Sequence, residues 1–203
     1  MFDAMERKLP IGVGRDGMPV YANVDFLDGT RGAHINISGV SGVATKTTYA
    51  TFLLYSLFRS GVLGAEATNT KALIFNVKGE DLLFLDHENT QLDLEAREKY
   101  AQLGLDPAPF PSVAIKAPPR RGDVNAGPDT ATRQRGVSSF FWTLQDFIEG
   151  ELLPFVFADA EDERQQYTMV IHQVMRRLLD GEKVGDDGAW QIDGVTLRTY
   201  HQL

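Results

Sequence analysis

The sequence predicts an α/β fold in three layers, with a parallel sheet between helices, and three observations lead to this expectation. Short apolar runs near 34–39, 71–77 and 112–117 have the length and the Gly or Pro boundaries of buried strands. An apolar run of helical character over about 45–60 joins the first two of these runs. A strand, a crossover helix and a second strand within about 40 residues make a βαβ unit, which requires parallel strands.

The composition is that of a folded protein without disulfides. The chain has 203 residues, 43% of them hydrophobic, which suits one domain or one domain with an insertion. It contains no cysteine, so disulfides and thiolate metal ligands are excluded. Its start lacks the layout of a signal peptide, and no stretch reaches the roughly 18 continuous apolar residues of a membrane span. We therefore expect a cytoplasmic protein with no membrane span.

Turn and periodicity signals predict the other elements of the first half. Residues 9–25 predict a β-hairpin, because Asp16-Gly17 separates two short alternating runs. Ser60-Gly61 ends the long helix, since glycine is favoured just beyond a helix C-terminus. Residues 92–103 predict a short amphipathic helix that ends at Gly104.

The second half of the chain has a different character. Residues 120–135 are polar and contain glycine, which predicts a long loop. Residues 138–150 and 159–179 predict two helices, the second with apolar residues at helical spacing. On that helix His172 is expected at a surface or interface, because no second His or Cys lies at metal-ligand spacing. Residues 190–192 predict a short strand.

A segment after the first predicted strand has the order found where proteins hold a nucleoside triphosphate. The strand Ile35–Ser38 runs into a loop of small residues, then Lys46-Thr47, then the long helix. Backbone N–H groups of such a loop face the phosphates, the lysine reaches the β- and γ-phosphates, and the threonine hydroxyl binds Mg²⁺. We expect ATP to be bound by Gly39, Ser41, Gly42, Val43, Ala44, Thr45, Lys46, Thr47 and Thr48, with Thr47 on the metal.

The match to the phosphate-loop pattern G-x-x-x-x-G-K-[ST] is incomplete. Thr45 and Val40 stand at its two glycine positions, and Gly39 lies one residue too early. A β-branched residue does not easily take positive φ, so the loop must bend differently from a standard one. The alternative is an ordinary strand–turn–helix corner that binds no ligand. The buried strand before the loop and the apolar helix after it favour nucleotide binding.

A charged turn, Lys78-Gly-Glu-Asp81, follows the second predicted strand. Ligands bind at the carboxyl ends of parallel strands, so these residues would lie at the same edge as the phosphate loop. The alternative is an exposed turn in which Glu80 and Asp81 favour the N-terminus of a following helix. The pattern does not decide between the two.

Three segments together resemble the HerA/FtsK-type P-loop ATPases, which are HerA helicase-like proteins with a DUF87-like central domain. His34-Ile-Asn-Ile-Ser-Gly39 is similar to their "H-x-x-I-x-G", and Asn76-Val-Lys-Gly-Glu80 to their "D-x-K/H-G-E". Leu9–Val13 is similar to the lead-in to their ATPase domain. The resemblance covers residues 9–86 and is loose beyond them.

The resemblance implies a RecA-like P-loop NTPase core with a helical insertion. Residues 1–30 would be a hairpin lead-in, 31–135 the core, and 136–203 the insertion and a truncated continuation. ATP hydrolysis with Mg²⁺ is implied, with Lys46 and Glu80 as catalytic residues, Glu80 polarising the attacking water. The implied partners are ATP and DNA. The net charge of −8 makes the chain alone a poor DNA clamp, so DNA would be contacted through an assembled homo-oligomer.

The chain departs from the family pattern at several positions. Asn76 replaces the strand-end aspartate, and Phe155–Asp159 is the only candidate for the Walker B strand. An acidic, helix-like run follows that candidate at once. We expect an incomplete domain whose hydrolysis needs elements beyond this chain.

Three functions remain open from the sequence. The first is the ATP-binding domain of a HerA-like DNA translocase or helicase. The second is a nucleotide-binding regulatory module without turnover, which the altered loop and missing Walker B strand favour. The third is an interaction domain with a degenerate phosphate loop. Hydrolysis separates the first two, and ATP binding separates both from the third.

Overall fold

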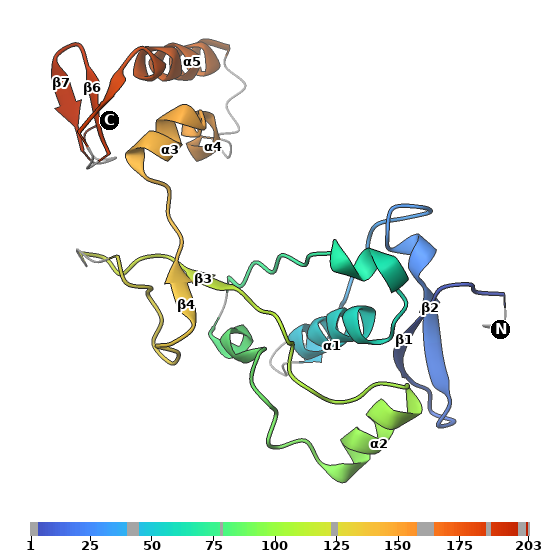
Figure 1. Cartoon of the computed structure of the whole chain (residues 1–203). Coiled ribbons are helices and arrows are strands. Elements are labelled where there is room, and N and C mark those ends of the chain that lie inside the picture. The colour runs from blue at the N-terminus through green and yellow to red at the C-terminus, as the bar shows by residue number, and fades with distance from the viewer. Residues whose placement is uncertain are drawn as a thin grey trace. The chain divides into compact units, whose positions relative to one another are not determined.

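The computed structural model shows a mixed α/β protein with short sheets (Figure 1). It describes residues 4–39, 45–77, 79–122, 126–157, 165–185, 188–198 and 202. The chain divides into two compact units. The first comprises Met1–Ala114 with Ala131–Arg133, and the second comprises Ile115–Thr130 with Gln134–Leu203.

The first unit begins with the predicted hairpin. Strands β1 (Lys8–Val13) and β2 (Pro19–Asn23) pair antiparallel. Between them the backbone N–H of Gly14 donates to the carbonyl of Met18 at 2.8 Å. Gly17 adopts φ +77°, a conformation that glycine enters without steric cost. The Asp-Gly turn signal therefore predicted this element correctly.

Helix α1 (Thr45–Arg59) confirms the predicted long helix and packs against β1 (Figure 1). Two of its hydroxyls donate to backbone carbonyls of that strand. Ser56 Oγ, which is fully buried, donates to the Pro10 carbonyl at 2.6 Å, and the Tyr49 hydroxyl donates to the Ile11 carbonyl at 3.0 Å. Leu53 and Leu9 are buried in the same unit. These bonds and the apolar burial fix α1 on the hairpin.

Helix α2 (Leu94–Gln102) confirms the predicted helix over 92–103. Asp93 caps its start, since the carboxylate accepts from the Ala96 backbone N–H at 2.8 Å. Gly104 follows its end at φ +70°, as expected beyond a helix C-terminus. Three short 3₁₀ helices complete the unit, at Val24–Phe26, Gly64–Thr68 and Asp81–Phe84.

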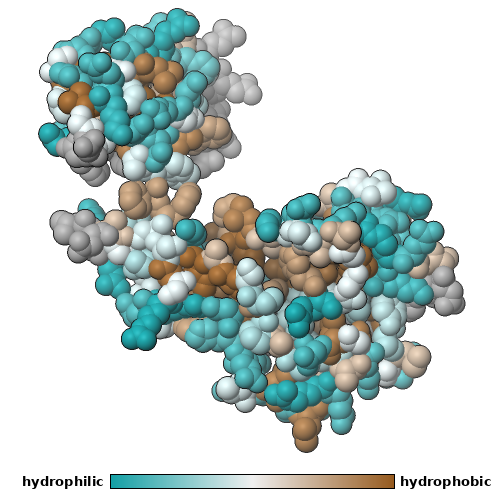
Figure 2. All heavy atoms as spheres, viewed as in Figure 1, coloured by the Kyte–Doolittle hydropathy of each residue, from teal (hydrophilic) through white to brown (hydrophobic). Residues whose placement is uncertain are grey.

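Two of the three predicted strands of the parallel sheet are wrong. Residues 34–39 and 71–77 are described, and neither forms a strand. Leu73, Phe75 and Val77 are 79%, 80% and 95% exposed. Figure 2 shows hydrophobic residues, coloured brown, on the surface of the molecule. A strand requires hydrogen-bonding partners for its backbone as well as apolar side chains. No described strand pairs with either segment.

The third predicted strand is present in the second unit, where it is shorter than expected. Strand β3 (Ile115–Ala117) pairs parallel with β4 (Val137–Ser139), and this is the one parallel pair among the described residues. Of the connection from 118 to 136, the described residues form no helix, in agreement with the predicted loop over 120–135.

The rest of the second unit is a small helix-and-sheet module. Its core is formed by Leu144, Ile148, Met175, Leu178, Trp190 and Leu197. The Trp190 indole N–H donates to the Leu178 carbonyl at 2.8 Å, which ties the sheet to the helix. The elements are α3 (Leu144–Glu149), α4 (Leu153–Val156), α5 (Gln165–Leu179), β5 (Glu182–Val184), β6 (Ala189–Ile192) and β7 (Val195–Leu197).

The predicted helices and strand of this module are confirmed with changed bounds. Helix α3 starts at 144 rather than 138, at the N-cap Thr143, whose side chain and that of Asp146 form a capping box. The predicted start of the second helix at 159 lies outside the described residues. Strand β6 contains the predicted strand, and β5 and β7 flank it as an antiparallel meander that the sequence did not predict.

Candidate functional site

The predicted phosphate loop is described at its two ends. Ser41, Gly42, Val43 and Ala44 lie outside the described residues, as does the side chain of Thr45. At the ends, Lys46 Nζ donates to the Gly39 carbonyl oxygen at 3.3 Å. A lysine ammonium has three donors, so two remain for other acceptors. This bond joins Gly39 and Lys46, the two described ends of the predicted loop.

The beginning of α1 provides an electropositive environment. The helix has 15 residues and no acidic residue in its first turn. Its N-terminal N–H groups and macrodipole favour an anion, and Lys46 adds a full positive charge in the same turn. Thr47 and Thr48 follow it and are exposed. The exposed Thr47 side chain suits a hydroxyl ligand to a metal ion carried by a phosphate group.

Glu80 is held by a distant segment of the first unit. Its carboxylate accepts from the backbone N–H groups of Ala131 at 2.7 Å and Thr132 at 2.6 Å, and also from the Thr132 hydroxyl. The hydroxyl contact, followed by the backbone contacts, lowers the pKa of Glu80 below its ordinary value. A carboxylate has about four acceptor positions, so three donors leave one for a water molecule.

Arg133 adds a second anchor for the same segment. Its buried guanidinium pairs with Asp86, with Nη2 2.8 Å from Oδ2, and also donates to the Leu83 carbonyl. This hydrogen-bonded guanidinium lowers the pKa of Asp86. Sequence reasoning placed Arg133 in a solvated loop and missed both anchors. An arginine within a polar loop, 47 residues from its carboxylate partner, gives no local signal of pairing.

A cavity of about 360 Å³ lies beside α1 in the first unit. We call it the aromatic pocket. Its wall comes from residues 48–55 of α1, residues 81–92, residues 97–100 of α2, and residues 107–110. Thr48 and Asp81 both line it, so the start of α1 and the turn after Gly79 face one cavity. The prediction that the phosphate loop and this turn lie at one edge of a parallel sheet is not confirmed, because neither 34–39 nor 71–77 forms a strand.

Aromatic rings form much of this wall. Tyr55 meets Tyr100 and Phe110 edge-to-face, with ring centroids 6.1 and 5.4 Å apart. Phe52 meets Tyr100 in the same way at 5.9 Å. The Tyr55 hydroxyl donates to the Asp106 carbonyl and accepts from the Ala108 N–H at 3.1 Å. Burial raises the pKa of Tyr100. These contacts hold the rings in fixed positions around the cavity.

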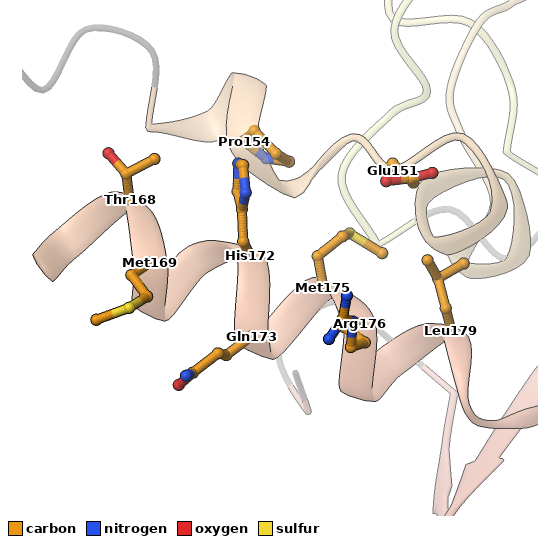
Figure 3. Close-up of a pocket in the computed structure, with 9 residues that line it drawn as sticks. All are labelled: Glu151, Pro154, Thr168, Met169, His172, Gln173, Met175, Arg176 and Leu179. Atoms are coloured by element: carbon orange, nitrogen blue, oxygen red, sulfur yellow. The ribbon is translucent and has the colours of Figure 1, made fainter. Parts of the chain in front are cut away.

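A second hollow, of about 800 Å³, lies between α4 and α5 in the second unit. Figure 3 shows His172 extending from α5 toward the segment with Pro154, while Gln173 extends to the opposite side of the helix. Met169, Met175 and Leu179 supply apolar surface. His172 is exposed, as expected from the sequence. No group of three potential metal-ligating side chains occurs among the described residues.

The candidate Walker B strand is wrong. Phe155 and Val156 lie in helix α4, and Asp159 is outside the described residues. Pro154 at the start of α4 explains the helix, because proline is favoured in the first helical turn. The described part of the candidate, residues 155–157, therefore forms no strand.

Comparison of the chain with protein-family models and with curated proteins gives no match. Within the described part of the chain, no helix is both long and apolar enough to cross a membrane.

Proposed function

We propose that this chain binds ATP through the segment that ends at Lys46, as the nucleotide-binding part of a HerA-like DNA translocase or helicase. The observation that carries the proposal is the bond from Lys46 Nζ to the Gly39 carbonyl. It brings a positive charge, a helix N-terminus and both ends of a small-residue loop to one point. This combination favours a multiply charged anion such as a triphosphate.

The residues fit the cofactors that this function needs. Lys46 would contact the β- and γ-phosphates, and Thr47 would supply one oxygen ligand to Mg²⁺. Mg²⁺ in such sites keeps several waters and takes its other ligands from phosphate groups, so one exposed hydroxyl is sufficient from this segment. Glu80, with one acceptor position left, would orient a water molecule rather than take its proton, because its lowered pKa makes it a weak base.

The proposal includes a three-layer RecA-like core and assembly into a homo-oligomer that contacts DNA. The sequence of 71–77 supports it, because this apolar run has the composition of a strand buried on both faces, and its side chains are exposed in this structure. In a complete core these side chains would be covered by helices. Hydrolysis would draw its remaining acid and its arginine finger from elements outside this chain.

A second function is favoured by two observations. The Glu80 carboxylate is engaged by residues 131–132, and the candidate Walker B segment is helical. Both favour a nucleotide-binding regulatory module that does not hydrolyse ATP. The two functions share the phosphate site and differ in turnover.

Calorimetric titration with Mg·ATP tests the shared site. Lys46→Ala removes a charge-assisted contact worth roughly 1.5–3 kcal/mol, so affinity should fall about tenfold to a hundredfold. Lys99→Ala is the matched control, since Lys99 pairs with Glu95 on the exposed surface of α2 at 2.6 Å. It should leave ATP affinity unchanged. Equal affinities for wild type and Lys46→Ala, or no binding by wild type at millimolar ATP, would show that the segment is a corner without a ligand.

A further inference from the structure

We propose that the aromatic pocket holds the base of the bound nucleotide, a purine with an exocyclic amino group. This inference rests on the proposed ATP site and names the part of the ligand that the phosphate segment leaves unassigned. The pocket and Lys46 belong to the same unit, and α1 contributes to both.

Position along α1 is the first argument. Lys46 lies in the first turn of the helix, and Thr48, Thr51, Phe52 and Tyr55 line the pocket. At about 1.5 Å of rise and about 100° of rotation per residue, Lys46 and Phe52 are separated by about 9 Å along the axis, and the lining residues lie on the opposite side of the helix from Lys46. The ligand would therefore pass over the N-terminal end of α1. A nucleotide spans a separation of this order between its phosphates and its base. Thr48 lies between the two parts, where the ribose would pass.

The chemistry of the wall is the second argument. Small-molecule pockets begin at about 300 Å³ and combine aromatic surface with a few polar groups, and this cavity of about 360 Å³ fits that description. Tyr55, Tyr100 and Phe110 are held in place by edge-to-face contacts, so a planar ligand meets a wall that is already ordered. Planar bases gain binding energy from aromatic rings.

The polar rim is the third argument, and it favours certain bases. Asp81 and Glu88 are exposed carboxylates on the pocket wall, and Arg97 adds an exposed guanidinium to it. Carboxylates accept hydrogen bonds and cannot donate them when ionised. Two carboxylates against one guanidinium favour a base that donates through an exocyclic amino group, such as adenine, over uracil, whose exocyclic groups are both carbonyl oxygens. ATP should therefore bind more tightly than UTP.

The test compares ligands that do and do not carry a base. Wild type, Phe84→Ala and Ala108→Trp are titrated by calorimetry with Mg·ATP, Mg·UTP and Mg·tripolyphosphate. Phe84 lines the pocket and is partly exposed, so its removal spares the core, while tryptophan at the exposed position 108 fills the cavity. Phe155→Ala is the matched control, because Phe155 is 74% exposed in the second unit. Thermal unfolding of each variant shows that it is folded.

The pocket variants should lose affinity for Mg·ATP, about tenfold for Phe84→Ala, and keep the wild-type affinity for tripolyphosphate. Lys46→Ala should weaken both ligands alike. If wild type binds ATP and tripolyphosphate equally, or if both pocket variants leave ATP affinity unchanged, the base lies elsewhere and the phosphate site stands. If wild type binds neither ligand, the proposed function fails and the inference with it.

Discussion

The two units hold their elements together by contacts of different range. In the module of residues 144–197, each strand of the β5–β6–β7 sheet pairs with its neighbour in sequence. In the first unit, hydrogen bonds that fix the elements join residues 38 to 53 positions apart, as in Tyr49 to Ile11, Ser56 to Pro10, and Ala108 to Tyr55. Local pairing needs only a turn, whereas distant pairing needs the whole unit to be assembled.

The apolar run over 71–77 belongs to the first unit but pairs with no described strand, near or distant in sequence. It has the composition of a buried strand, yet Phe75 is 80% exposed and the run pairs with no described strand. A parallel strand requires a partner delivered by a crossover, and composition does not supply that partner. An apolar sequence therefore predicts that a segment is suited to burial. Whether it is buried depends on whether other strands or helices pack against it.

The largest effect should come from the core of the local module. Ile148 is 0% exposed and packs in the cluster with Leu144 and Trp190. Ile148→Ala should lower the free energy of unfolding by about 2–5 kcal/mol through lost burial and a cavity. Phe75→Ala removes a larger side chain, but the change should lie within about 0.5 kcal/mol because that side chain is already in water. Urea unfolding of the three proteins measures both differences.

If Phe75→Ala lowers the free energy of unfolding by about 2 kcal/mol or more, the contrast between Ile148 and Phe75 is contradicted, since losses of that size indicate a packed side chain. It would mean that residues 71–77 are covered in solution. Such a result would favour the three-layer core proposed for the complete ATPase domain.

A long-range hydrogen bond should have the next largest effect. The Ser56 hydroxyl is buried and donates to the Pro10 carbonyl. Ser56→Ala leaves that carbonyl without its donor and should cost about 1–3 kcal/mol. The matched control is Ser60→Ala. Ser60 lies four residues after Ser56, just beyond the end of α1, and its buried Oγ has no hydrogen-bond partner among the described residues. The control should be neutral or slightly stabilising, and thermal unfolding compares the pair. Equal losses in both variants would show that the Ser56 bond is not what holds α1 on β1.

Local signals in the sequence were sufficient for much of the fold. The Asp16-Gly17 turn predicted the hairpin, the apolar run before Ser60-Gly61 predicted α1, and the stripe over 159–179 predicted α5. Each depends on residues within one or two turns of chain. The parallel sheet through 34–39 and 71–77 was predicted because two strands joined by a crossover helix must be parallel if they pair. That rule sets their direction and does not ensure that they pair.

The candidate site divides in the same way. The order of strand, loop and helix predicted Lys46 at the start of α1. The helix is present, the strand over 34–39 is not, and Lys46 Nζ donates to the Gly39 carbonyl. The aromatic pocket could not be predicted, because Phe52, Tyr100 and Phe110 come from three segments whose meeting depends on tertiary packing. The binding of Glu80 by residues 131–132 was missed for the same reason.

The smallest effect concerns pH, and it tests the anchor at Glu80. Hydrogen bonds from Thr132 and Ala131 lower the pKa of Glu80 below its ordinary 4.5. A carboxylate whose pKa is depressed by folding adds stability above its unfolded pKa and loses it as pH falls through the folded value. The advantage of wild type over Glu80→Gln should therefore be present at neutral pH, begin to fall near pH 4.5, and be lost as pH drops through the lower pKa of the folded state. Glu98→Gln, which alters an exposed carboxylate on α2, controls for the loss of one negative charge.

Unfolding midpoints of the three proteins, measured over a pH series, test this prediction. A difference between wild type and Glu80→Gln that does not change with pH would mean that the fold does not depend on the ionised carboxylate.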